Sequence, residues 1–192
     1  MAGPRCPDCG VVEWTSGFED RDRNGRCPNC AQFPTLGHDV GTLIQERYAI
    51  PDGDLQGQPF LLTNEMWRFL LRFYRIDPFT TLDESLGVWK LPFVFFRGAQ
   101  LVRPQKWGKG PFSASLVCAE CDPDGPVRFD GWDADGLPVG KPWVTPWWQI
   151  TAYSADQTDN VWSSLVPMIE LGALAADIPD TGKTRINLPR GG

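Results

Sequence analysis

The chain has 192 residues, of which 42% are hydrophobic and 22% charged, so it is long enough to bury a core as one domain with a small appendage. Its 18 basic and 24 acidic residues give a net charge of −6, which excludes a polybasic binder as a description of the whole chain. It contains no run of about 18 apolar residues, and its first residues lack the apolar core of a secretory signal. We therefore expect a soluble cytoplasmic protein without membrane contacts.

The first 34 residues contain two Cys-x-x-Cys pairs with seventeen residues between them. Two such pairs supply four thiolates in the tetrahedral arrangement that structural Zn²⁺ prefers. Metal binding would provide most of the folding free energy, because the segment has little apolar material. The alternative is a disulfide-bonded fold, which requires an oxidising compartment that nothing in the chain indicates. The pattern predicts a zinc ribbon over residues 1–34 with the ligands Cys6, Cys9, Cys27 and Cys30.

Two helices are predicted in the next part of the chain. Residues Val40–Tyr48 form a short amphipathic pattern. Thr63 is a plausible N-cap for a second helix, in which apolar residues recur at helical spacing. The apolar positions of that helix are Met66, Phe69, Leu70 and Phe73.

Beyond residue 90 the predicted strands and helices alternate, which favours an α/β fold with a parallel sheet flanked by helices. The acidic, glycine-rich segment Cys121–Pro142 is expected to be a surface hairpin or loop. Because the chain stops directly after a predicted strand, we expect it to be part of a longer protein. The predicted strands are Pro92–Arg97, Ala99–Val102, a buried Trp147–Tyr153 and Thr184–Leu188, and the predicted helices are Phe112–Cys121 and Asp156–Leu174.

A third Cys-x-x-Cys pair, Cys118 and Cys121, falls at the end of one of these predicted helices. No second pair lies near it in the sequence, and small cysteines at such places are ordinary packing residues. We interpret the pair as part of the core. A second metal site or a redox pair is the alternative.

The segment RPQKWGKG, residues 103–110, lies between a predicted strand and a predicted helix, as a phosphate-binding loop does. In such a loop, backbone N–H groups and the positive helix end face the phosphates, and a lysine reaches the outer ones. Gly108 and Lys109 match the last glycine and the lysine of the pattern G-x-x-x-x-G-K-[ST]. Arg103 replaces the first glycine, and Gly110 replaces the hydroxyl residue that binds Mg²⁺. A plain basic turn is the alternative.

Three runs resemble the ATPase portion of bacteriophage terminase large subunits, most closely the forms found in phages of actinobacteria. They are LVRPQKWGKGPFSASLVCAE, GPVRFDGWDADGLPVGKPW and WWQITAYSADQTDNVWSSL. The resemblance extends over about residues 35–192, and FDGWDADG with PVGKP is its most specific element. It implies a P-loop ATPase domain over 35–192 that is incomplete, since the family's acidic strand and its nuclease domain would follow residue 192. In that family ATP hydrolysis drives DNA into a preformed capsid.

The same resemblance assigns roles to the residues of the loop. It implies that Lys109 is the catalytic lysine on the β- and γ-phosphates of ATP, with magnesium as the further cofactor. Met66 stands near the place where the family often has an adenine-reading glutamine. Without the acidic strand, we expect ATP binding with poor turnover. The implied nucleotide-binding residues are Arg103, Gln105, Lys106, Trp107, Gly108, Lys109 and Gly110.

The implied partners are double-stranded DNA, the portal and a small terminase subunit, with a homo-oligomeric ring for the full-length protein in the cytoplasm of the bacterial host. The stretch from Arg68 to Lys109 has a net charge of +5, which suits contact with the DNA backbone without base reading. For Arg68, Arg72 and Arg75, which share one face of a predicted helix, we prefer a solvated surface over nucleic-acid contact. The alternative function is a non-enzymatic zinc-ribbon adaptor that binds nucleic acid or protein.

Overall fold

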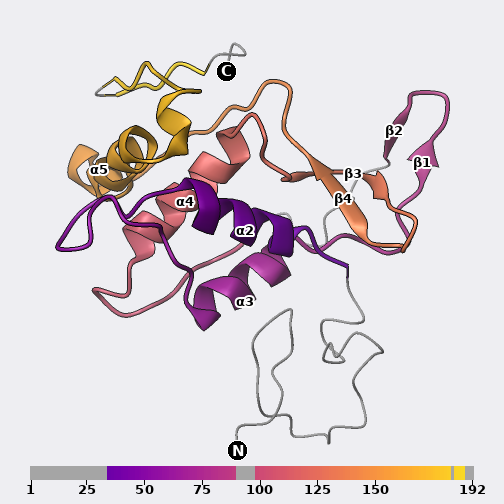
Figure 1. Cartoon of the computed structure of the whole chain (residues 1–192), viewed down its shortest axis with the longest axis horizontal. Helices are drawn as coiled ribbons and strands as arrows, with labels where there is room; N and C mark the ends of the chain where they lie inside the picture. Colours follow the sequence, from indigo (N-terminus) through magenta and orange to yellow (C-terminus); the bar gives the residue numbers. More distant parts are fainter. Residues whose placement is uncertain (1–33, 90–97, 183, 189–192) are drawn as a thin grey trace, which may run out of the picture. The chain divides into compact units, whose positions relative to one another are not determined.

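The computed structural model describes residues 34–89, 98–182 and 184–188 (Figure 1). Within these ranges the chain divides into two compact units. The first consists of Met1–Gly41, Leu62–Ala99 and Phe129–Gly140, and the second of Thr42–Leu61, Gln100–Arg128 and Lys141–Gly192, as far as these residues are described. The predicted zinc ribbon and the predicted strand Pro92–Arg97 lie outside the described residues. The same holds for the proposed zinc ligands Cys6, Cys9, Cys27 and Cys30.

The helical part of the first unit comprises the start of helix α2 (Gly37–Arg47) and helix α3 (Asn64–Phe73), so both predicted helices are confirmed. The hydroxyl oxygen of Thr63 accepts a hydrogen bond from the N–H of Met66 at 3.3 Å, as an N-cap does. The ring of Trp67 occupies the space that a side chain at Gly41 would need. Residues from both helices and from the segment after α3 form the core: Leu36, Val40, Met66, Leu70, Leu71, Tyr74 and Ile76.

Two small hairpins complete the first unit. Strand β1 (Leu82–Asp83) pairs antiparallel with β2 (Val88–Trp89), a hairpin that sequence reasoning missed. Strands β3 (Arg128–Trp132) and β4 (Pro138–Lys141) form the other sheet, so of the hairpin or loop predicted for the acidic segment the structure has the hairpin. The Asp133 carboxylate holds its turn by accepting hydrogen bonds from the N–H groups of Asp135 and Leu137.

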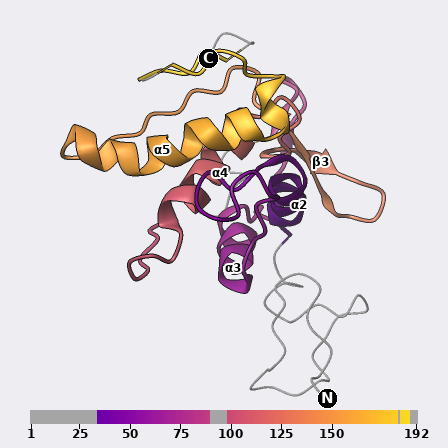
Figure 2. The same ribbon diagram turned by 60° about the vertical axis from the view of Figure 1, so that its left-hand side comes forward.

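The second unit is built mainly from helices α4 (Lys109–Cys121) and α5 (Ala155–Leu171), followed by the short 3₁₀ helix η2 (Ala173–Ala175). The sequence predicts both long helices. The two helices pack against each other, and the segment that leads to α5 runs back alongside it (Figure 2). In the described ranges, no helix is both long enough and apolar enough to cross a bilayer. Fully or almost fully buried side chains in this unit include Phe112, Ala114, Cys118, Met168, Ile169 and Leu174.

The predicted parallel sheet does not occur within the described ranges. Each of the two sheets there joins strands that are neighbours along the chain through a short turn, a connection that antiparallel pairing allows. The prediction of a buried strand at Trp147–Tyr153 is wrong, because this segment has no strand partner, and Trp147 is 77% and Tyr153 99% exposed. The segment Ala99–Val102 is also unpaired, and of the strand Thr184–Leu188 there remains one bridge between Thr181 and Ile186. Apolar composition alone predicted these strands, and it does not supply the neighbour that a strand needs.

Candidate functional site

The predicted phosphate loop forms an irregular turn that ends where α4 begins. Gly108 is the N-cap residue of α4 and has a φ of +94°, in the left-handed region that glycine adopts without strain. Lys106 has a φ of +64°, which is uncommon for a residue with a side chain. The helix therefore starts at Lys109, the lysine of the Gly-Lys pair.

The side chain of Lys109 closes this loop. Its amine donates hydrogen bonds to the carbonyl oxygens of Arg103, at 2.9 Å, and Pro104, at 2.8 Å. An ammonium group has three N–H donors, so one is left without a partner within the described chain. The amine lies at the mouth of a turn that is largely exposed to solvent.

An aromatic anchor attaches the loop to the core of the second unit. The ring of Trp107 meets the ring of Phe112 edge to face, with their centroids 5.8 Å apart, and Phe112 is fully buried in α4. The guanidinium of Arg103 lies over the indole of Trp107, 5.6 Å from the ring centroid. Gln105 and Lys106 are exposed. The loop thus holds the cations of Arg103, Lys106 and Lys109 within eight residues.

Gly110 is required by the packing of α4 on α5. A Cβ atom at this position would lie 2.6 Å from the carbonyl oxygen of Asn160 and 3.4 Å from the hydroxyl oxygen of Ser164. A side chain at position 110 would therefore point at α5 and not into the loop. The Mg²⁺-binding hydroxyl of the phosphate-loop pattern has no room in this structure, so position 110 does not fit a magnesium site.

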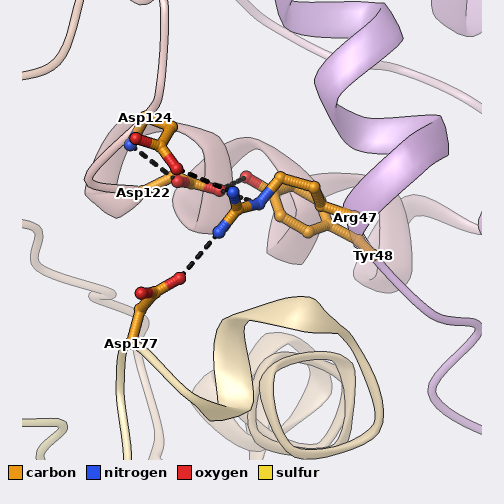
Figure 3. A network of polar contacts seen from close by, with 5 residues as sticks. All are labelled: Arg47, Tyr48, Asp122, Asp124 and Asp177. Carbon is orange, nitrogen blue, oxygen red and sulfur yellow. Dashed lines mark hydrogen bonds and ion pairs between the residues drawn. The ribbon is translucent and has the colours of Figure 1, made fainter.

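At the opposite end of α4, one guanidinium joins three carboxylates (Figure 3). Arg47, the last residue of α2, donates to Asp124 at 2.8 Å and to Asp177 at 2.7 Å. Its Nε atom lies 3.2 Å from an oxygen of the buried Asp122, close enough for an ion pair but without the alignment of a hydrogen bond. That same oxygen accepts a hydrogen bond from the hydroxyl of Tyr48 at 3.0 Å. We call these five residues the Arg47 cluster.

Burial and charge act against each other in the Arg47 cluster. Burial raises the pKa of Asp122, while the N–H of Asp124 and the charge of Arg47 act to lower it. Burial alone would lower the pKa of Arg47, but the charges of the three surrounding carboxylates have the larger combined effect, so the pKa is raised. Burial also raises the pKa of the Tyr48 hydroxyl, which stays protonated and donates to Asp122. These groups are occupied with one another, which is the arrangement of a structural cluster. Sequence reasoning missed it.

The two cysteines at the end of α4 are neutral thiols. Cys118 is 1% exposed, which confirms its interpretation as a core residue. Burial raises the pKa of the half-buried Cys121 to about 12, with the nearby Glu120 and Asp122 adding to the shift. A metal ligand must be a thiolate, so a metal at this pair would have to displace both protons. Throughout the described ranges, no group of three or more metal-binding side chains was found.

A cavity of about 670 Å³ lies in the second unit, apart from the loop. No residue of 103–110 lines it. Its walls come from the last turns of α4, from α5 and from the segments on either side of α5. Sequence reasoning missed this cavity, because it placed Trp147 and Trp148 in a buried strand. The signal available in the sequence was the pair of adjacent tryptophans itself.

Comparison with known proteins relates the chain to bacteriophages. It is 32% identical over 160 residues to the Gene 13 protein of Mycobacterium phage L5, and 31% identical over 160 residues to the Gene 13 protein of Mycobacterium phage D29. Each match includes 83% of this chain and 23% of the relative, so the chain spans about a quarter of the length of these proteins. Neither a protein-family model nor a solved structure matches the chain.

Proposed function

We propose that the chain is the amino-terminal portion of a phage terminase large subunit, the motor that packages viral DNA, and that residues 103–110 bind ATP. The observation that carries this proposal is the start of α4 at Lys109, directly after the left-handed Gly108. Similarity to mycobacteriophage proteins agrees with a phage motor, as does the family resemblance of the sequence.

The loop offers a set of donors suited to a polyphosphate. Lys109 has one N–H without a partner in the described chain, and the exposed Lys106 adds a second ammonium. The first N–H groups of a helix have no acceptor inside it, so the start of α4 adds positive potential at the same place. The guanidinium of Arg103 would contribute a further charge. Bound ATP would supply the phosphoanhydride bond whose hydrolysis drives packaging.

These donors would hold the phosphates of ATP, but the loop lacks the hydroxyl residue that positions Mg²⁺ for rapid hydrolysis. Phosphoryl transfer depends on positioning and on neutralising charge, for which the pattern uses a hydroxyl-bound Mg²⁺. Because Gly110 faces α5, we expect this chain to bind ATP and to turn it over poorly. In the same proposal, DNA contacts are made to the backbone, Zn²⁺ is held by the four amino-terminal cysteines, and the full-length protein assembles as a ring on the portal with the small subunit.

The test is the affinity for ATP of the wild type and of Lys109→Ala, measured by calorimetry. A charged hydrogen bond to phosphate is worth about 1.5–3 kcal/mol, so we expect affinity to fall about tenfold or more. Lys141→Ala, at the end of β4 outside the loop, is the matched control and should leave affinity unchanged.

Lys109→Ala also removes the two hydrogen bonds that close the loop, so a second variant separates charge from loop structure. Lys106 makes no hydrogen bond within the described chain, and Lys106→Ala should weaken ATP binding without lowering thermal stability. Equal ATP affinity for the wild type, Lys109→Ala and Lys106→Ala would refute the loop as the site.

A further inference from the structure

The cavity of the second unit has an apolar floor. Leu165 and Ile169 of α5, together with Ile178 and Cys118, line it, and each is at most 3% exposed. Its volume of about 670 Å³ lies in the range of small-molecule pockets, which is about 300–1,000 Å³. The floor therefore belongs to the buried core of the second unit, while the segments before and after α5 complete the walls.

Three of the chain's nine tryptophans line this cavity: Trp147, Trp148 and Trp162. Trp162 is half-buried on α5, whereas Trp147 is 77% and Trp148 46% exposed. Exposing two adjacent indoles to water is unfavourable unless something covers them. Indole faces stack well on flat aromatic rings, which makes a planar ring the best complement to this surface.

The polar groups of the lining fit the edge of an uncharged heterocycle. Gln149 offers an amide with both donors and acceptors, Asp159 a carboxylate and Arg185 a guanidinium. The two charges cancel, so the lining has no excess of positive charge to hold a polyphosphate. No residue of the loop 103–110 lines the cavity, so the two sites share no side chain, although Thr158 and Asp159 of the lining directly precede Asn160, which contacts Gly110.

We propose that this cavity binds a nucleobase, presented either by an uncharged nucleoside or by a base of a single strand. The ring stacks on the tryptophans, and its edge bonds to the amide, carboxylate and guanidinium of the lining. Purines bind better than pyrimidines, because their larger faces cover more of the indole surface. This site is separate from the ATP loop and goes beyond the function proposed above.

Calorimetric titration of the 192-residue chain with adenosine tests this proposal. We expect saturable binding that Trp147→Ala weakens about tenfold, because stacking on one indole contributes on that scale. Tyr153→Ala removes a still more exposed aromatic side chain of the same segment that does not line the cavity, and should bind like the wild type. Trp147 is largely exposed, so its replacement should leave the unfolding midpoint unchanged. Arg185→Ala is a second variant with an exposed side chain that should also weaken binding.

Two controls keep this test independent of the ATP loop. Lys109→Ala should bind adenosine with the affinity of the wild type, even if its affinity for ATP is lost. Competition by a short single-stranded oligonucleotide would identify a strand as the source of the base, and its failure to compete would identify the free nucleoside. The proposal is overturned if no saturable binding occurs up to the solubility limit of adenosine, or if Lys109→Ala abolishes binding that Trp147→Ala and Arg185→Ala leave intact.

Discussion

At the amino-terminal end of α4 the charged side chains have few partners, whereas at its carboxyl-terminal end they are bound to one another. Lys109 bonds only to carbonyl groups of its own loop, and Lys106 extends into solvent. Asp122, the C-cap residue of the same helix, is buried and lies between Arg47 and Tyr48. The comparison teaches that charge alone does not identify a binding site. A site needs charge that the fold has not already used.

The largest expected effect is at the carboxyl-terminal end. Asp122→Ala should lower the free energy of unfolding by about 3–5 kcal/mol, because it removes one partner of a buried ion pair and leaves Tyr48 without its acceptor. Asp124→Ala removes a carboxylate that is 69% exposed and is paired with the same guanidinium, and should cost at most about 1 kcal/mol. Denaturant unfolding at pH 7 measures both. Equal losses for the two variants would contradict the distinction between the buried and the exposed member of the cluster.

At the amino-terminal end, introducing the hydroxyl residue of the phosphate-loop pattern at position 110 should destabilise the fold. Gly110→Ser places a side chain 2.6 Å from the carbonyl oxygen of Asn160, and we expect a loss of about 1–3 kcal/mol in unfolding free energy. Gly98→Ser, where no atom lies within 4 Å of the added Cβ, is the matched control and should be close to neutral. A stable Gly110→Ser protein with Mg²⁺-dependent ATP hydrolysis would contradict this prediction. It would show that α5 can move away from position 110 and that a hydroxyl there can bind Mg²⁺.

The smallest effect concerns the thiols near the Arg47 cluster. The folded-state pKa of Cys121 is about 12 against an ordinary value of 9.0, so the folded chain keeps a proton that the unfolded chain loses as the pH rises. Stability is therefore retained below pH 9 and lost above it, by about 1 kcal/mol between pH 9 and pH 10. Cys121→Ser should show a smaller loss over the same interval in parallel denaturant titrations. Identical pH profiles for both proteins would place Cys121 in contact with water.

Local signals in the sequence predicted the helices well. Thr63 before a helical apolar pattern located α3. Helix α4 was also predicted, but it begins at Lys109 and not at the predicted Phe112, so the last two residues of the predicted loop belong to its first turn. These signals are local because a cap and its partner lie within a few residues of each other. The acidic, glycine-rich composition of Cys121–Pro142 predicted a hairpin or loop, and in the structure Asp133 and Gly136 lie in the turn between β3 and β4.

The features that the sequence did not predict depend on distant partners. Arg47 meets Asp122 and Asp177, which lie 75 and 130 positions further along the chain, and no spacing rule connects them. The prediction of a strand at Trp147–Tyr153 was wrong because the apolar residues of this segment either line a cavity or are exposed, and none of them lies within a sheet. Gly110 departs from the phosphate-loop pattern because α5 approaches it closely, and that approach is invisible in the sequence.

The contact at Gly110 has a mechanical consequence. The backbone of Gly110 lies close to the backbone of Asn160 there, and the nearest side-chain atom of α5 is the hydroxyl oxygen of Ser164. A tilt of the first turn of α4 towards α5 would therefore require the second turn of α5 to move as well. The position of the basic loop at the start of α4 is thereby tied to the position of α5.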